Sequence, residues 1–369
     1  MGKAKILVVF GTRPEAIKMC PLILALRQKA GVEVRLLLTG QHRDMVTPVL
    51  DFFGVRADAC LDVMREGQSV GDLTERLLRA LPGEMQGESR PDLVLVHGDT
   101  TSAFVGALCA FYAGIGVAHV EAGLRTGDVH APFPEEFNRR AIDAMSDLYF
   151  APTGASAERL IAEGYPKERI FIVGNTATDA LRLCLEHPPS RPFDVAGRRL
   201  LVITAHRREM SCKQRYDLLT AIRQEIERRE DVLAVFPVHP SPAVGQVAKA
   251  VFGGCANVRL TPPLSLPDMQ HLLARAYLLL TDSGGMQEEA TYLGLPTLVL
   301  RDVTERPEGV RAGVLRIVGT KGEAVRAALG EWLDHPDARD GVAKPSWVYG
   351  DGYVSERIAE ILARWRTKP

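Results

Sequence analysis

Short apolar runs alternate with longer amphipathic segments along almost the whole chain. The runs are rich in valine, isoleucine and leucine, which is typical of parallel strands that helices cover on both faces. In a first series, strands are predicted within 5–10, 32–40, 92–99, 116–123, 147–153 and 169–176. After Pro188 the pattern restarts, and strands are predicted within 199–207, 232–240, 257–263, 277–285 and 296–302. Helical spacing is predicted between strands, for example through Ala141, Ile142, Met145 and Leu148.

Two series of this kind predict the α/β class, with two Rossmann-like, doubly wound domains. We predict an N-terminal domain over 1–173 and a C-terminal domain over 174–352, joined within 174–198. The last segment, 353–369, has the periodicity of a helix, and we expect it to pack back on the first domain.

Composition and charge narrow the class of protein. Hydrophobic residues make up 46% of the 369 residues and charged residues 25%, as in ordinary globular proteins. The net charge of -1 predicts no bulk attraction to nucleic acid or to an anionic membrane. No apolar run approaches the roughly 20 residues of a membrane span. The six cysteines are scattered without a CxxC pair, which favours a reducing, cytoplasmic compartment.

Polar motifs follow most of the predicted strands directly. In open α/β sheets, ligands bind beyond the carboxyl ends of strands, so these loops are the preferred place for a site. In chain order the loops contain GTRPE, TGQHR, HGDTT, VEAGLR, TAHRRE, PVHP, TDSGG and RDVTERPE. So many polar loops at strand ends favour one ligand site over a set of unrelated turns.

Two carboxylates stand where predicted strands end. Asp99 closes the motif HGD and Glu121 opens the motif EAG, so small neighbours leave space around each acid. Carboxylates in a desolvated cleft can exchange protons near neutral pH, which makes both acids candidates for proton transfer. Glu135 and Glu136 follow Pro134, where an ordinary helix start also explains acidic residues.

The segment TDSGG has the chemistry of a phosphate site, because Ser283, Gly284 and Gly285 lie between a predicted strand and a predicted helix. Glycines let the backbone approach a ligand, and free N–H groups at a helix start favour anions. A plain turn capped by Ser283 explains the same letters. Cations in other motifs that could neutralise a diphosphate are Arg13, Lys18 and Arg306.

Two histidines follow strands of the second series, and a structural histidine is the alternative for both. His206 precedes two arginines and could stabilise a developing phosphate charge, whereas His239 lies in the motif PVHP. We expect no metal and no nicotinamide cofactor, because metal-ligand spacings and a GxGxxG motif are absent from the sequence. The combination predicts proton transfer on a nucleotide-linked substrate.

The chain resembles the non-hydrolysing UDP-N-acetylglucosamine 2-epimerases of bacteria over essentially its full length. The matching motifs occur in the order of that family: FGTRPEAIKM, TGQHRDM, VLVHGDTTS, HVEAGLRTGD, PFPEEFNRR, GNTATDA, TAHRRE, PVHP, LTDSGGMQEEA and RDVTERPEG. The resemblance implies a glycosyltransferase-B-like architecture, with two Rossmann-like domains facing across a cleft. It also implies interconversion of UDP-GlcNAc and UDP-ManNAc by a cytoplasmic homodimer that supplies precursors for cell-surface polysaccharide.

The resemblance further implies a mechanism and residue roles. Members are thought to eliminate UDP, hold a 2-acetamidoglucal and add UDP back after protonation of the other face. By motif, the catalytic residues are Asp99, Glu121, Glu135 and His206, the last associated with the leaving UDP. The substrate-binding residues are Arg13, Lys18, Arg139, Ser283, Gly284, Gly285, Glu289 and Arg306.

The residues associated with regulation and with recognition of the base match the family pattern less closely. Many members bind a second UDP-GlcNAc as an activator, and the corresponding residues here are Gln41, Glu136, Arg208 and His239. Asp44 stands where some regulated members have Gln, and Gly67 where some have Arg. The segments 210–212 and 261–269 depart from the family pattern, the second on the side that holds the uracil.

Three other functions fit some of the same motifs. One is an epimerase of a related UDP-diacetamido-uronic acid, which shares the motifs. Another is a glycosyltransferase on the same fold, which needs an acceptor. A third is an inactive regulator that binds a UDP-sugar, and the four intact catalytic candidates speak against it.

Overall fold

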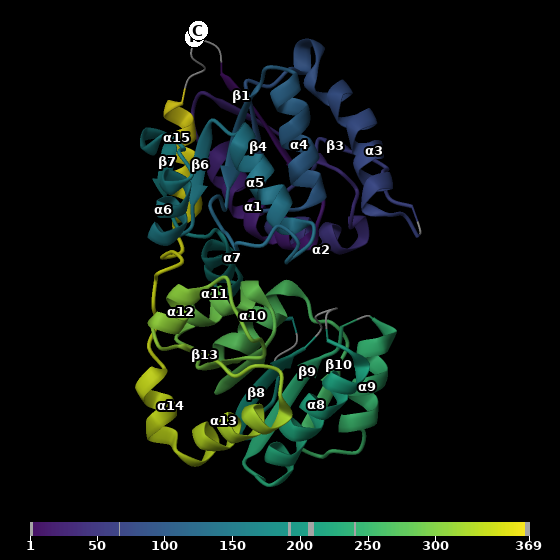
Figure 1. The fold of residues 1–369 in the computed structure, drawn as a ribbon, viewed down its shortest axis with the longest axis vertical. Coiled ribbons are helices and arrows are strands. Elements are labelled where there is room, and N and C mark those ends of the chain that lie inside the picture. Colours follow the sequence, from purple (N-terminus) through teal and green to yellow (C-terminus); the bar gives the residue numbers. More distant parts are fainter. Residues whose placement is uncertain (1–2, 66, 191–192, 206–209, 240, 366–369) are drawn as a thin grey trace. The chain divides into compact units, whose positions relative to one another are not determined.

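The computed structural model describes residues 3–65, 67–190, 193–205, 210–239 and 241–365. These form two compact units (Figure 1), and the predicted α/β class with two Rossmann-like sheets is confirmed. The first unit comprises Met1–Ala180 and Gly350–Pro369, and the second Leu181–Tyr349. This division falls inside a helix at Ala180, and the boundary predicted from the sequence is 173/174.

The first unit is built on a parallel sheet of seven strands in the order β3-β2-β1-β4-β5-β6-β7. Its buried strands are uniformly apolar, as the sequence predicts, because helices cover both faces. The strands are β1 (Ala4–Phe10), β2 (Val32–Leu38), β3 (Ala59–Cys60), β4 (Leu93–His97), β5 (Gly116–Val120), β6 (Leu148–Ala151) and β7 (Ile170–Ile172).

Eight helices of the first series accompany this sheet in the described chain, the last of them returning from the end of the sequence. They are α1 (Arg13–Arg27), α2 (Arg43–Phe53), α3 (Val70–Ala80), α4 (Thr101–Tyr112), α5 (Glu135–Met145), α6 (Gly154–Ala162), α7 (Ala177–Leu185) and α15 (Val354–Arg364). Short 3₁₀ turns lie at Leu81–Met85, Gly87–Ser89 and Lys167–Arg169.

Helix α15, yellow in Figure 1, belongs to the first unit and packs against α1. Its apolar face buries Ile358 and Leu362 completely. Its start is fixed by Asp179 of α7, whose carboxylate accepts the backbone N–H groups of Val354 and Ser355 at 2.9 and 2.6 Å. The carboxylate thus satisfies amides that the first turn of the helix leaves without an internal partner.

The second unit repeats the plan with six parallel strands in the order β10-β9-β8-β11-β12-β13. These are β8 (Arg199–Thr204), β9 (Val232–Pro237), β10 (Val258–Thr261), β11 (Leu278–Thr281), β12 (Thr297–Val299) and β13 (Leu315–Ile317). The accompanying helices are α8 (Cys212–Glu227), α9 (Pro242–Phe252), α10 (Leu266–Ala274), α11 (Gly284–Leu293), α12 (Pro307–Arg311), α13 (Gly322–Asp334) and α14 (Pro336–Val342).

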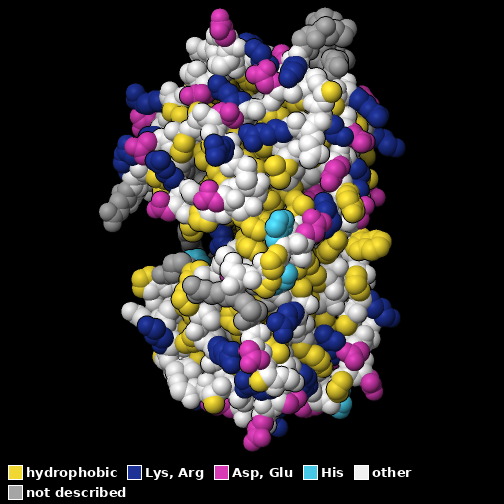
Figure 2. Space-filling model, turned by 180° about the vertical axis from the view of Figure 1, so that it is seen from behind, with side chains coloured by type: hydrophobic (Ala, Val, Ile, Leu, Met, Phe, Trp, Pro, Cys, Tyr) yellow, Lys and Arg dark blue, Asp and Glu magenta, His cyan; other side chains and the backbone are white. Residues whose placement is uncertain are grey.

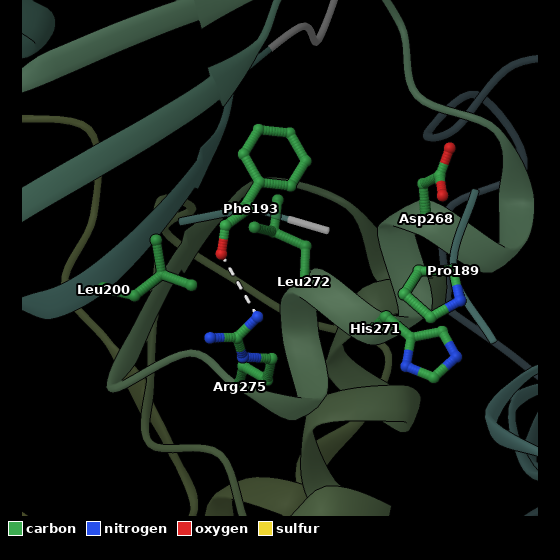
Figure 3. A pocket seen from close by; sticks show the side chains of 7 residues that line it. All are labelled: Pro189, Phe193, Leu200, Asp268, His271, Leu272 and Arg275. Carbon is green, nitrogen blue, oxygen red and sulfur yellow. Dashed lines mark hydrogen bonds between the residues drawn. The ribbon is translucent and has the colours of Figure 1, made fainter. Parts of the chain in front are cut away.

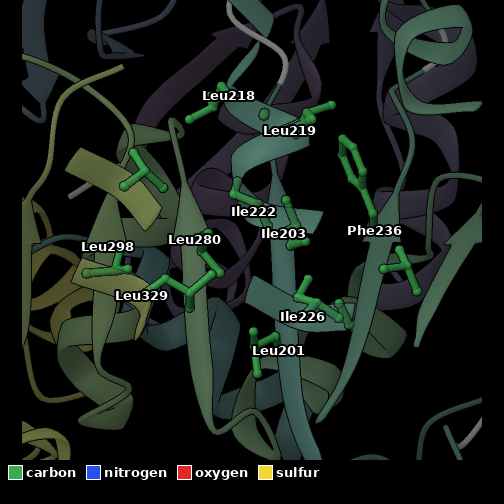
Figure 4. Packing of buried hydrophobic residues seen from close by; sticks show 14 of the residues in the cluster. Leu201, Ile203, Leu218, Leu219, Ile222, Ile226, Phe236, Leu280, Leu298 and Leu329 are labelled. Carbon is green, nitrogen blue, oxygen red and sulfur yellow. The ribbon is translucent and has the colours of Figure 1, made fainter. Parts of the chain in front are cut away.

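The core of the second unit has a layer on each face of the sheet, one against α8, α9 and α13 and the other against α10 and α11. Figure 4 shows Ile222 and Ile226 of α8 packed with Leu201 and Ile203 of β8, all without exposed surface. The side chains are spaced at i and i+4 on the helix and at alternate positions on the strand, so the two periods of the sequence meet in one layer.

Each predicted strand is present, and two short edge strands, β3 and β13, were not predicted. They contain two and three residues and are partly exposed, so neither forms a distinct apolar run. Leu148 was included both in the helical spacing of Met145 and in the predicted strand within 147–153, and it begins strand β6. On the surface, positive and negative side chains are interspersed over the visible face (Figure 2), in keeping with the small net charge.

Candidate active site

Each sheet has a switch point, where the chain leaves one side of a central strand and continues on the other. In the first sheet it lies between β1 and β4, and in the second between β8 and β11. The loops after such strands diverge to opposite faces of the sheet, which opens a crevice at their carboxyl ends. The predicted loops after β1, β4 and β5 meet at the first switch point, and that after β11 lies at the second.

Glu121, directly after β5, is the centre of a buried cluster of charged and polar groups. Lys18 Nζ of α1 donates to Glu121 Oε1 and Oε2 at 2.9 and 2.7 Å. His97 Nε2, at the end of β4, lies 3.0 Å from Glu121 Oε2, and Asn175 Nδ2 donates to Oε1 at 3.2 Å. The Glu121 side chain is only 7% exposed, so the carboxylate is held almost out of water by groups that can share or compensate its charge.

The backbone of Glu121 is strained in the same place. Its φ is +70°, in the left-handed region that side chains other than glycine rarely adopt. Such a conformation costs about 1–3 kcal/mol and persists only where the surroundings determine it, often at functional sites. Here the N–H groups of Glu121 and Ala122 both donate to the carbonyl of Phe150 at 3.1 Å. Gly98 has a φ of +63°, and a Cβ there would meet Glu121 Oε2 at an ordinary contact distance of 3.7 Å, so it is the backbone conformation that favours glycine.

Asp99 lies in a different environment, two residues beyond the end of β4. Its Oδ2 accepts from both Nε and Nη2 of Arg139, the first at 3.0 Å, and its side chain is 25% exposed. Asn138 Nδ2 fixes the backbone by donating to the Asp99 carbonyl at 2.9 Å. Asp99 and Glu121 therefore lie in distinct environments: Glu121 is buried against lysine, and Asp99 is bound to arginine and partly open to solvent.

Helix α5 begins with Glu135 and Glu136, whose side chains lie in different environments. Glu135 is half-buried at the first position of the helix. Glu136 has no exposed surface and accepts from Thr126 N, Gly127 N, Arg139 Nη1 and Arg140 Nε at 3.0 to 3.4 Å. Its carboxylate thus ties α5 to the loop after β5.

The loop after β1 is joined to the loop after β4 by Glu15. The Glu15 carboxylate accepts from Gly11 N and Thr12 N at 3.1 and 2.8 Å, and from Thr100 Oγ1 at 2.7 Å. Burial raises the pKa of the Glu15 carboxyl, and these hydrogen bonds offset part of the increase. Arg13, half-buried at the start of α1, is positioned by this capped loop. Gln41 Oε1 accepts from Ser102 Oγ of α4 at 2.9 Å.

In the second unit, Ser283 is the N-cap residue of α11, and Gly284 and Gly285 form its first turn. A Cβ on Gly284 would stand 2.7 Å from Nη1 of Arg306, whereas Gly285 has nothing within 4 Å of that position. Arg306 therefore lies flat against the helix start, where its Nε donates to Glu288 Oε1 at 2.9 Å. An arginine beside free N–H groups of a helix start is a suitable anion site.

The charge of Arg306 is shared with a second carboxylate. Burial alone would raise the pKa of Glu305, but the hydrogen bonds from Arg301 and the charge of Arg306 outweigh it and lower that pKa to about 2. Glu305 therefore stays ionised at neutral pH and holds Arg306 and Arg301 together at 3.3 and 2.8 Å.

The remaining predicted residues of the second unit are spread apart. Glu289, 9% exposed, accepts from Gln270 Nε2 of α10 at 2.9 Å. His239 is exposed beyond β9, and its Nδ1 accepts from Ser241 N at 3.2 Å. His206 and Arg208 lie outside the residues that the structure describes.

Each unit contains a hollow of its own, and the two differ greatly in volume. One in the second unit, lined by Phe193, Leu200 and Leu272 among others (Figure 3), has a volume of about 20 Å³, which is room for water only. A groove of about 780 Å³ in the first unit lies between β7 and α15. Its lining contains none of the predicted site residues, so neither hollow is the candidate site.

Sequence reasoning missed three residues that the structure adds to the site: His97, Asn175 and Glu15. All three were part of quoted motifs, and the position of His97 and Glu15 two residues from a candidate was an available signal. Asn175 follows the short edge strand β7, and a contact with Glu121 across the sheet leaves no trace in sequence spacing. No described helix is long and apolar enough to cross a membrane.

Comparison with known proteins gives a consistent result. The sequence model of a family described as UDP-N-acetylglucosamine 2-epimerase matches residues 24–363. The UDP-N-acetylglucosamine 2-epimerase of Bacillus subtilis is 45% identical over 364 residues, covering 98% of this chain and 96% of its own. A Neisseria meningitidis UDP-GlcNAc 2-epimerase bound to UDP-GlcNAc has a TM-score of 0.93 at 37% identity, covering 97% of this chain and 99% of its own. A Methanocaldococcus jannaschii epimerase in complex with UDP-GlcNAc and UDP has a TM-score of 0.82 at 31% identity, with the same coverage.

Proposed function

The chain belongs to the UDP-N-acetylglucosamine 2-epimerase family, and we propose that it interconverts UDP-GlcNAc and UDP-ManNAc. The observation that carries the proposal is the strained, buried Glu121 held by Lys18, beside the separately held Asp99. Inversion at C2 requires a proton to leave one face of the sugar and another to arrive on the opposite face. Two carboxylates held by different partners are suited to this, because one can take the proton and the other can supply one.

The C2 proton is not acidic, so its removal needs a leaving group on C1. In the proposed first step, a carboxylate takes the C2 proton, the electron pair forms the C1–C2 double bond, and the C1–O bond to UDP breaks. In the second step UDP adds back to C1, and C2 is protonated on the other face. Asp99, Glu121 and Glu135 are the proposed acid and base groups, and Arg139 orients Asp99.

UDP must be held while it is detached from the sugar. The start of α11, with Ser283, Gly284 and Gly285 beside Arg306, is the proposed site for the diphosphate. Glu289 and Arg13 are proposed as further nucleotide contacts. His206 is proposed to donate to the departing diphosphate, whose negative charge grows as the C1–O bond breaks.

Proton NMR of the purified protein with UDP-GlcNAc in D₂O tests the proposal. UDP-ManNAc should form, and deuterium should appear at C2 of both sugars, since the abstracted proton exchanges with solvent. The Glu121→Gln variant should be slower by about 10²–10⁴-fold. A matched control is Glu75→Gln, which removes an exposed carboxylate of α3 paired with Arg79 and should retain the native rate. Formation of UDP-ManNAc with complete retention of the C2 hydrogen would refute the mechanism.

We also propose that neither added metal nor nicotinamide is required, because the sequence lacks the corresponding ligand patterns. Unchanged turnover after dialysis against a chelator is the expected result. The homodimer, the cytoplasmic location and the role in polysaccharide supply rest on the family resemblance. Light scattering of the eluted protein tests the dimer, and a monomer at micromolar concentration would exclude it.

For activation by a second UDP-GlcNAc, the described residues give unequal support. Gln41 and His239 are partly or fully exposed and so accessible to a ligand. The Glu136 carboxylate is instead occupied by four donors of its own unit, which supports a structural role. Sigmoidal dependence of the UDP-ManNAc to UDP-GlcNAc rate on added UDP-GlcNAc would identify activation, and Gln41→Ala should then remove it.

A further inference from the structure

Behind the two acids lies a buried ionic network that the proposed mechanism does not use. His119 of β5 and Asp143 of α5 are both fully buried, and His119 Nδ1 lies 2.6 Å from Asp143 Oδ1. Asp143 Oδ2 accepts from Arg125 Nη2 at 2.7 Å, and the same nitrogen donates to Glu163 Oε2 at 2.7 Å. Two cations and two anions thus alternate along one line if the histidine ring is charged.

Each ring nitrogen of His119 faces an oxygen atom that accepts hydrogen bonds. The partner of Nδ1 is a carboxylate that already accepts from arginine, and the partner of Nε2 is the carbonyl of Gly98 at 2.8 Å. Both partners are acceptors, so the ring satisfies both only when each nitrogen carries a proton. A histidine on the apolar strand β5 thus links a side chain on one side to a backbone carbonyl on the other.

The network touches the backbone of both acid-bearing loops. His119 Nε2 holds the carbonyl of Gly98, the residue just before Asp99. Asp143 Oδ2 accepts from the N–H of Gly123, two residues after Glu121, at 3.4 Å. Gly98 and Gly123 both have positive φ, so neither loop has a regular conformation of its own to stabilise it.

We propose that His119, together with Asp143, is a positioning residue for the epimerisation: it fixes the Gly98 carbonyl and with it the direction of Asp99. The inference rests on the proposed function. Asp143 lies one helical turn beyond Arg139 on α5, the residue that binds Asp99. The dyad and the arginine thus fix the backbone and the side chain of the same loop from one helix. A displacement near 1 Å of a reacting group can lower a rate by about 100-fold.

Two substitutions separate the two ring nitrogens. The amide nitrogen of glutamine reaches about as far as Nε2 of histidine, so His119→Gln keeps a donor for the Gly98 carbonyl. The amide nitrogen of asparagine corresponds to Nδ1, so His119→Asn keeps the bond to Asp143 and loses the carbonyl. We expect His119→Asn to lower kcat by about 100-fold with KM changed less than about threefold. His119→Gln should retain kcat within about fivefold.

A purely structural histidine would give another result, because both variants would lose thermal stability and turnover alike. Asp179→Ala is the matched control, since it removes a buried carboxylate that caps α15 and so destabilises the same unit through another helix. It should lower Tm while leaving kcat per folded molecule at the native value.

Hydrogen–deuterium exchange measured by mass spectrometry supplies a readout independent of activity. Amides within 97–101 should exchange faster in His119→Asn than in His119→Gln, and at the native rate in Asp179→Ala. Equal exchange in the two His119 variants, or equal kcat, would overturn the inference. An inactive native protein would instead refute the proposed function, and the exchange comparison would still decide whether His119 holds the loop.

Discussion

The buried pair of Lys18 and Glu121 allows a double-variant experiment in which a second substitution should restore stability. The two side chains are 11% and 7% exposed, and Lys18 Nζ lies 2.7 Å from Glu121 Oε2. With an effective dielectric constant of about 20, the gross attraction of unit charges at that distance is about 6 kcal/mol. The desolvation of both ions cancels much of this, so the pair contributes little net stability, but removing one partner leaves a buried charge.

Lys18→Met should therefore cost about 3–5 kcal/mol of unfolding free energy in the first unit. Glu121→Gln should cost about 2 kcal/mol. It leaves the Lys18 ammonium without a counter-charge, but the amide oxygen still accepts a hydrogen bond from it. In the double variant the amide no longer needs the ammonium, so the loss should be smaller than in Lys18→Met alone. Glu121→Gln and the double variant should lack normal turnover, because both lose the carboxylate that is proposed to transfer the proton.

Native-state hydrogen exchange of amides in β4 and β5 measures the opening of the first unit without interference from the second. The exposed pair of Arg79 and Glu75, at 79% and 62% exposure, is the matched control, and a cycle through Arg79→Met and Glu75→Gln should give a coupling of at most about 0.5 kcal/mol. A double variant less stable than Lys18→Met would refute the account of Glu121 as a buried charge.

Three further predictions concern the phosphate site and the second acid. Gly284→Ala should displace Arg306 and cost about 1–2 kcal/mol of stability in the second unit. Gly285→Ala has open space around the new Cβ, so it should be neutral or stabilising by up to about 1 kcal/mol. Chemical unfolding of the ligand-free protein compares the two variants. The folded pKa of Glu305, about 2, lies below its usual 4.5, so the stability that this carboxylate contributes is complete above about pH 4.5 and is lost as the pH falls toward 2. The difference in unfolding free energy between the native protein and Glu305→Gln, on the order of 2–3 kcal/mol at pH 7, should vanish over that window. A difference that does not change with pH would contradict this prediction. Asp99→Asn should slow C2 deuterium incorporation by about 10²–10⁴-fold without lowering Tm by more than a few degrees, and a near-native rate would return Asp99 to a structural role.

Much of the fold could be predicted because it depends on local pattern. The strands of a covered parallel sheet are continuous apolar runs, and each run found in the sequence became a strand. The two missed strands, β3 and β13, lie at sheet edges and are too short for a pattern. The division at Ala180 lies inside α7, whose sequence carries no break there, so the sequence offers no signal for this position.

The site was predictable as a set of loops but not as a set of contacts. Asp99 and Glu121 were predicted as candidates because each follows a predicted strand; these strands are β4, at the switch point of the sheet, and its neighbour β5. Lys18 and Arg139 were also identified by motif. In the structure Lys18 pairs with Glu121, and Arg139 pairs with Asp99. The network of His119 and Asp143 was missed, because a histidine on an apolar strand gives no sign of the carbonyl and carboxylate on either side of it.

The place of α15 has a consequence for the order in which the protein can fold during synthesis. The ribosome releases the chain from the N-terminus at about 5–20 residues per second, and all of Leu181–Tyr349 is made between the two parts of the first unit. For on the order of ten seconds or more, while the second unit is being made, Asp179 and the face of α1 that α15 covers must therefore remain without their partners, and the second unit has its complete sequence before the first does. The nascent first unit is thus the part that a chaperone would protect, and a premature stop before Val354 would leave it incomplete however well the second unit folds.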